Sequence, residues 1–163
     1  LKSCIAQNTL LGFAGADKSG DTKTGSLAML RLYLSEAKRF AASPDRYRAA
    51  NSDTGLTYLD LNALIPAVRG QQKMLIHVNS APDIRSALKI ANEYNLDIIL
   101  VGAKEAWRVA VDIAAANVPV ILNPTDNLPS GFEAMAATLS NAERLAAAGV
   151  TIAFYDSGIG YEF

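Results

Sequence analysis

Residues 73–101 read KMLIHVNSAPDIRSALKIANEYNLDIILV, and they carry the main evidence for the fold class. It begins with the apolar run Met74–Val78 and ends with the apolar run Ile98–Val101. Short runs rich in β-branched residues are typical of strands that are buried on both faces of a sheet. Between them, the apolar spacing over residues 82–94 is that of a helix. The stretch therefore predicts a strand–helix–strand unit.

The same unit repeats along the rest of the chain. Each of two further apolar runs follows a helical stretch, and these four segments are residues 105–116, 118–122, 133–148 and 150–154. The middle residues of the first three runs, His77, Ile99 and Ile121, are 22 residues apart. The last interval is longer because residues 125–132 are inserted. Since crossovers of this kind are right-handed, the runs predict a parallel sheet in an α/β fold.

The region before the repeats is less regular. The short apolar run Leu10–Ala14 is a candidate buried strand. Apolar residues at three- and four-residue steps predict a helix over residues 26–42. A second helix is expected over residues 60–69, with a kink or an early end at Pro66.

Two architectures contain such repeats: an open doubly wound sheet and an eightfold barrel. A closed barrel typically needs about 250 residues, whereas this chain has 163. No strand is followed by the G-x-G-x-x-G fingerprint of a dinucleotide fold. We expect a partial (β/α) TIM barrel of about four parallel strand–helix units, preceded by one or two helices. Residues 1–163 would form one domain, with a loop and helices in 1–72 and βα repeats in 73–163, as a fragment of a larger barrel.

Composition excludes several classes of function. Half of the residues are hydrophobic and 19% are charged, which is typical of a soluble globular protein. Fifteen basic residues stand against sixteen acidic ones, so nucleic acid is not an expected partner. No apolar run reaches the length of about 18 residues that a membrane span needs. Nothing in the sequence decides between a cytoplasmic and a periplasmic location.

Side chains at the carboxyl ends of parallel strands converge on one mouth. This rule selects His77 and Asn79 after the first apolar run, Asn123 after the third and Asp156 after the fourth. It also selects Ser80, Lys104, Glu105, Asp126, Tyr155 and Ser157.

Two of these residues have alternative interpretations. His77 is either a neutral core histidine bonded to a backbone carbonyl or carboxylate, or a metal ligand. Asp156 is either a general base or ligand, or a turn residue in the segment Asp-Ser-Gly.

Five segments, read in order, resemble the amidohydrolase superfamily. They are DLNALIPAVRG (60–70), LIHVNSAPDI (75–84), LVGAKEAW (100–107), VPVILNPTDNLP (118–129) and AAAGVTIAF (146–154). The branch they resemble most is that of imidazolonepropionase-related or prolidase-like amidohydrolases. The resemblance covers about residues 60–157.

This resemblance implies a metal-dependent barrel hydrolase that cleaves carbon–nitrogen bonds in a small amide, cyclic amide or dipeptide. The implied cofactor is a divalent metal, most often zinc, that activates a water. His77 matches the family's histidine ligand on the fifth barrel strand. Asp156 approximates the last-strand aspartate that handles the proton. Asn79 and Asn123 would then bind the substrate.

The chain departs from the family pattern in three places. It contains one histidine, so the H-x-H pair of the first barrel strand is absent. Leu100-Val101-Gly102 stands where the family has a histidine–glycine pair. Around Asp156, the segment Phe154-Tyr155-Asp156-Ser157 is one residue tighter than the family pattern. By itself the chain cannot assemble the family's metal centre, and we expect it to be the C-terminal half of a larger enzyme.

Two other functions stay open. A half-barrel has two open sheet edges, which predicts a catalytically silent structural module that forms a homo-oligomer through those edges. Alternatively, the helix N-termini near Asn79, Gly102 and Ser130 would hold an anion in a small ligand-binding domain.

Overall fold

Five parallel strands form one open sheet, and their order in the sheet is their order in the chain. The computed structural model describes residues 6–16, 22–44 and 54–155. The strands are β1 Ala6–Leu10, β2 Lys73–Val78, β3 Ile98–Gly102, β4 Val120–Leu122 and β5 Ile152–Phe154. The helices are α1 Phe13–Ala16, α2 Lys23–Ala42, α3 Tyr58–Val68, α4 Ala81–Tyr94, α5 Ala110–Ala115 and α6 Asn141–Ala147, with 3-10 turns η3 Ala106–Val109 and η4 Phe132–Ala134.

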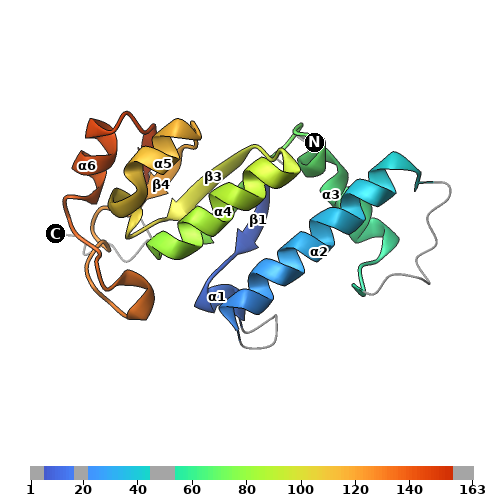
Figure 1. The fold of residues 1–163 in the computed structure, drawn as a ribbon, viewed down its shortest axis with the longest axis horizontal. Helices are drawn as coiled ribbons and strands as arrows, with labels where there is room; N and C mark the ends of the chain where they lie inside the picture. The colour runs from blue at the N-terminus through green and yellow to red at the C-terminus, as the bar shows by residue number, and fades with distance from the viewer. Residues whose placement is uncertain (1–5, 17–21, 45–53, 156–163) are drawn as a thin grey trace.

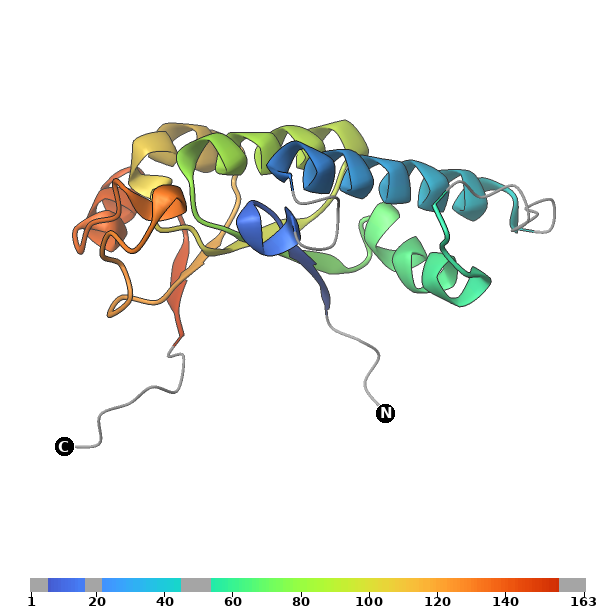
Figure 2. The same cartoon turned by 90° about the horizontal axis from the view of Figure 1, so that it is seen from below.

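Helices α2, α4 and α5 lie along one face of the sheet, and no helix of the described residues lies across the other face (Figure 1 and Figure 2). Consecutive strand order with right-handed crossovers puts every crossover on the same side. A doubly wound sheet would instead reverse its strand order at a switch point. The fold is therefore α/β, as predicted, and it is consistent with a partial (β/α) barrel.

The first strand does not lie where the sequence predicted it. Strand β1 occupies residues 6–10, and residues 13 and 14 of the expected strand belong to α1. Polar residues inside β1 have specific distant partners, which is why the apolar pattern did not identify it. Gln7 Nε2 donates to the carbonyl oxygen of Ala63, and Asn8 Oδ1 lies 3.0 Å from His77 Nε2.

Side-chain caps explain why two helices begin earlier than the sequence pattern predicted. Helix α2 begins at Lys23 because the Thr22 hydroxyl accepts a hydrogen bond from the backbone N–H of Gly25 at 2.9 Å. Helix α3 begins at Tyr58 because Thr57 and Asp60 form a reciprocal capping box. Pro66 lies in the last turn of α3 without ending it.

The helix expected over residues 133–148 is mostly absent. Only residues 141–147 are α-helical, and η4 is a single 3-10 turn. The buried Glu105 carboxylate accepts the backbone N–H of Ala136 at 2.9 Å, which takes this segment out of a regular helix. Likewise, the helix expected over residues 105–116 begins as the 3-10 turn η3.

The core lies between the sheet and the helices. In β2, Met74, Ile76 and Val78 are almost fully buried, whereas the residues between them are less buried. Leu34 and Phe40 of α2 are fully buried in the same cluster. Alternate residues of β2 therefore face the helices, and the others face the opposite side of the sheet.

The register aligns one row of side chains across that opposite side. Leu10 pairs with His77, His77 with Val101, Val101 with Ile121 and Ile121 with Ala153. In register-paired positions of a parallel sheet, the side chains point the same way. The row is apolar except for His77.

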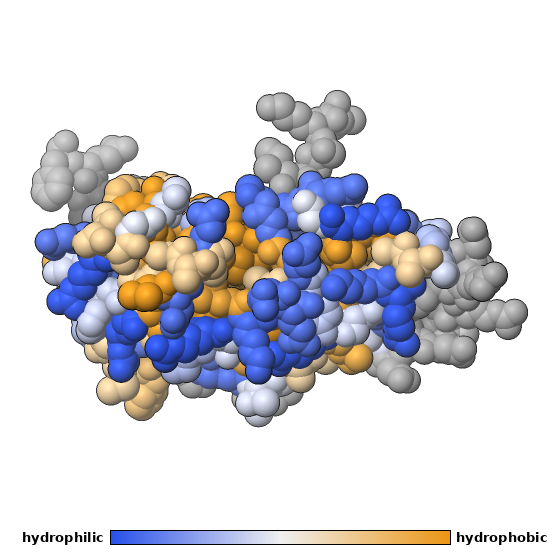
Figure 3. All heavy atoms as spheres, turned by 45° about the horizontal axis from the view of Figure 1, so that its top comes forward, coloured by the Kyte–Doolittle hydropathy of each residue, from blue (hydrophilic) through white to orange (hydrophobic). Residues whose placement is uncertain are grey.

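Polar residues cover much of the outer surface of the helices (Figure 3). Ion pairs join neighbouring helices there: Arg31 of α2 with Glu93 of α4 at 3.2 Å, and Arg85 of α4 with Asp112 of α5 at 3.0 Å. Within the described residues, no helix is long and apolar enough to cross a membrane.

Candidate functional site

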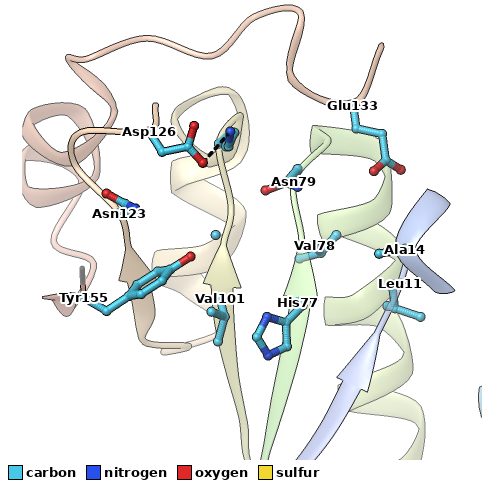
Figure 4. Close-up of a pocket in the computed structure, with 12 residues that line it drawn as sticks. Leu11, Ala14, His77, Val78, Asn79, Val101, Asn123, Asp126, Glu133 and Tyr155 are labelled. Carbon is cyan, nitrogen blue, oxygen red and sulfur yellow. Dashed lines mark ion pairs between the residues drawn. The ribbon is translucent and has the colours of Figure 1, made fainter. Parts of the chain in front are cut away.

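A pocket of about 210 Å³ lies where the carboxyl ends of the five strands meet (Figure 4). Each strand contributes residues from its end or from the segment that follows it. The lining residues are Leu11, Ala14, His77, Val78, Asn79, Val101, Gly102, Lys104, Asn123, Asp126, Glu133 and Tyr155. Most of the residues that the strand-end rule selected therefore line this pocket.

The close fit between Asn79 and Gly102 shapes the floor of the pocket. Gly102 has a φ of 84°, a left-handed conformation that favours glycine. A Cβ at this position would lie 2.8 Å from Asn79 Oδ1. Glycine therefore suits both the left-handed φ and the lack of space for a Cβ. The Asn79 amide lies against the end of β3.

Lys104 and Asp126 form an ion pair on the pocket wall. Lys104 Nζ lies 2.9 Å from Asp126 Oδ2 and donates to Ser130 Oγ at 3.3 Å. The two side chains differ in exposure, at 14% for Lys104 and 63% for Asp126. The ammonium is part of the pocket wall, whereas its partner extends into solvent.

Asn123 lines the pocket and also shapes the loop that follows β4. Its Oδ1 accepts hydrogen bonds from the backbone N–H of Thr125 at 3.1 Å and from the Thr125 hydroxyl at 2.8 Å. This Asx turn fixes the direction of the loop that carries Asp126.

His77 lies on the open face of the sheet beside Val101 (Figure 4). Its Nε2 lies 3.0 Å from Asn8 Oδ1, so an asparagine side chain takes the place of the carbonyl or carboxylate expected for a core histidine. Burial lowers the pKa of the imidazole below its ordinary value of 6.5, because desolvation penalises the charged form. Burial therefore favours the neutral form of His77.

A metal centre does not fit the described residues. Within residues 6–16, 22–44 and 54–155, no group of three or more His, Cys, Asp or Glu side chains is placed to hold an ion. A hydrolytic zinc site takes three protein ligands. The neighbours of His77 in the register are Leu10 and Val101, whose side chains have no atom that can bind a metal. Asp156, the predicted catalytic carboxylate, lies outside the described residues.

The strand-end rule did not select Glu133, a charged residue of the pocket. It comes from η4 rather than from a strand end, and its Oε1 lies 2.8 Å from Lys23 Nζ. A Cβ at Gly12 would collide with the same carboxylate. No local spacing signals these contacts, because the partners are far apart in the chain.

The sheet order, the one-sided helices and the strand-end pocket are those of an α/β fold that is consistent with a partial (β/α) barrel. The structure is similar to the crystal structure of an amidohydrolase from Thermotoga maritima MSB8, with a TM-score of 0.82 and 19% identity. The similarity covers 98% of this chain and 43% of that protein, so the chain spans less than half of its length. The sequence matches no family model and no curated protein. At this identity, the similarity establishes the fold.

Proposed function

We propose that this chain is the substrate-binding half of an amidohydrolase-type enzyme that acts on carbon–nitrogen bonds of small molecules. The observation that carries the proposal is the convergence of five strand ends on one polar pocket. In barrel enzymes the active site lies at this end of the strands. The sequence resemblance and the similarity in fold support the same class of enzyme.

Asn79 is suited to bind an amide group in this pocket. A carboxamide offers both a donor and an acceptor, so it can pair with the carbonyl oxygen and the N–H of a substrate amide. Asn123 lies across the pocket on the loop that follows β4 and would border the same substrate. The pocket volume of about 210 Å³ suits a small molecule.

Hydrolysis would require groups beyond those described. A metal supplies an activated water in enzymes of this class, but the described residues do not fit one, and we assign no step to it. The roles proposed for His77 and Asp156 therefore depend on ligands from another part of the assembled barrel. Equal and negligible metal content in the wild type and His77→Ala would count against His77 as a ligand in this chain.

Titration with two neutral amides, N-acetylglycinamide and succinimide, followed by NMR amide shifts, tests the proposal. We expect saturable shifts at Asn79, Gly102 and Lys104, and their loss in Asn79→Ala. Arg85→Ala, which removes an exposed ion pair on the helix face, serves as the control and should bind normally. The proposal fails if neither amide shifts the pocket resonances or if Asn79→Ala binds as the wild type does.

A second candidate function is self-assembly, because both sheet edges are open in the described residues. Neither β1 nor β5 has a strand on its outer side there. We propose a second copy of the chain as the occupant, with β1 of each copy beside β5 of the other. This parallel, two-fold arrangement would complete both sheets at once.

Sedimentation velocity tests the assembly. We expect a dimer for the wild type and a monomer for Leu10→Asp, since Leu10 is 42% exposed on the uncovered face of β1. Val111→Asp is the control, because Val111 is 76% exposed on α5, on the helix side of the sheet. A wild type that stays monomeric at high concentration would contradict this function.

A further inference from the structure

We propose that Lys104 recognises a carboxylate on the substrate, and that Asp126 holds the place of this carboxylate in the free protein. The inference rests on the proposed function and narrows its substrate class to amides that also carry a carboxylate, such as N-acyl amino acids. Four observations carry it: the fixed backbone at Lys104, the unequal exposure of the ion pair, the charges around the pocket, and the position of Asn79.

The backbone on both sides of Lys104 is held in place. The Ala103 N–H donates to the carbonyl oxygen of Val78 at 2.7 Å, and the Glu105 N–H donates to that of Asn79 at 3.0 Å. Ala103 is fully buried, and the Glu105 side chain is anchored by two backbone N–H groups. Lys104 therefore presents its ammonium from a rigid turn.

The partner of Lys104 is much less restrained. Asp126 lies in the exposed segment Pro124–Asp126, and its side chain is 63% exposed. An ion pair with an exposed member stabilises a protein by about 0–1 kcal/mol. An incoming carboxylate can therefore replace Asp126 on Lys104 at small cost.

The charged residues around the pocket favour the binding of an anion beside Lys104. Of the described residues that line the pocket, Lys104 is the one lysine or arginine. The other lining carboxylate, Glu133, already has Lys23 at 2.8 Å. A substrate carboxylate on the other side of the pocket would lie near Glu133, whose partner Lys23 already pairs with Asp83 as well.

The position of Asn79 links the two substrate groups. Its Oδ1 lies against Gly102, two positions before Lys104 in the same turn. An amide on Asn79 and a carboxylate on Lys104 would thus be close neighbours. This is the arrangement of an amide and a carboxylate in a short molecule such as an N-acyl amino acid.

Isothermal titration calorimetry with N-acetylglycine and N-acetylglycinamide tests the inference, because the two probes differ only in the charged group. We expect the wild type to prefer N-acetylglycine by about fivefold, the equivalent of one exposed ion pair. Lys104→Met should abolish this preference, Lys104→Arg should keep it, and Asp126→Asn should increase it.

The matched control is a second Lys–Asp pair at the other end of the sheet. Lys73 at the start of β2 lies 2.7 Å from Asp97, and both side chains are about half exposed. Lys73→Met and Asp97→Asn should leave the preference for N-acetylglycine as it is in the wild type.

Each outcome decides between the two proposals. A weaker preference in Asp126→Asn, or an unchanged preference in Lys104→Met, overturns the role of Lys104. Equal binding of the two probes by the wild type also overturns it while leaving the proposed function in place. Binding of neither probe rejects this inference, and it rejects the proposed function as well when succinimide also fails to bind.

Discussion

Lys23 and Glu133 join two segments that are far apart in the sequence at the rim of the pocket. The Nζ of Lys23, the first residue of α2, lies 2.8 Å from Oε1 of Glu133 in η4. The same ammonium lies 3.1 Å from Oδ2 of Asp83 in the first turn of α4. One lysine therefore ties the loop that follows β4 to two helices on the opposite side of the pocket.

Replacing Lys23 with Met should loosen that loop. We expect faster hydrogen exchange over residues 128–139, because Glu133 and Asp83 lose their shared cation. Lys89→Met, at an exposed position of α4, is the control and should leave the exchange unchanged. Equal exchange in Lys23→Met and the wild type would show that the ion pair does not hold the loop.

The pH range of this effect follows from the pKa of Lys23. Burial lowers the pKa of the ammonium, but hydrogen bonds to Glu133 and Asp83 outweigh burial and raise it above its ordinary value of 10.5. A raised pKa in the folded state means that the stabilisation is present below 10.5 and lost as the pH rises through the folded value. The difference in unfolding free energy between Lys23→Met and the wild type should therefore disappear as the pH rises above 10.5.

Replacing Glu105 with Ala should be strongly destabilising. The Glu105 side chain is buried, and it accepts the backbone N–H of Ala81 at 3.1 Å and that of Ala136 at 2.9 Å. Removing both acceptors leaves two N–H groups unsatisfied and should cost about 3 kcal/mol of unfolding free energy. Glu105→Gln keeps one acceptor and should lose about half as much.

Urea unfolding followed by Trp107 fluorescence measures this loss, since Trp107 is the single tryptophan and donates to the carbonyl oxygen of Ala136. An unfolding free energy for Glu105→Ala within about 0.5 kcal/mol of the wild type would contradict the anchoring role.

Gly102→Ala and Gly149→Ala separate backbone strain from a collision in the pocket. Both glycines have a left-handed φ, 84° and 81°, so alanine should cost about 1 kcal/mol or more at either site. Only at Gly102 does the new Cβ also meet Asn79 Oδ1, because nothing lies within 4 Å at Gly149. We expect Gly102→Ala to be the less stable variant and to lose affinity for N-acetylglycinamide. Equal losses of stability with unchanged binding would mean that Asn79 moves away freely.

His77 should make the protein less stable as the pH falls. Burial lowers the pKa of its imidazole in the folded state, so the unfolded chain takes up a proton first. The stability is therefore complete above 6.5 and decreases as the pH falls through 6.5 toward the folded value. Plots of unfolding free energy against pH for the wild type and His77→Gln should diverge across that range. Parallel plots would contradict the effect of burial on the His77 pKa.

Strands β2, β3 and β4 could be predicted from the sequence because each is a short apolar run between helical patterns. Helix α4 was predicted to within one residue, since Ser80 caps its start and Asn95 ends it in the left-handed conformation. Strand β1 could not be predicted in this way, because its polar residues Gln7 and Asn8 depend on partners in α3 and β2.

The candidate site was predictable only in part. The strand-end rule selected Asn79, Lys104 and Asn123 because it uses topology, which the repeat pattern reveals. It missed Glu133, which reaches the pocket through a tertiary ion pair with Lys23. The one-domain assignment to residues 1–163 and the role of Asp156 stay predictions.

The chain order of the strands has a consequence for how the protein is made. Every strand pairs with the strand of the unit before it, so each new strand–helix unit finds its partner already synthesised. Such a sheet can grow from β1 toward β5 while the chain is still emerging from the ribosome. The outer edges of β1 and β5, at the two ends of this order, both stay free in the described residues.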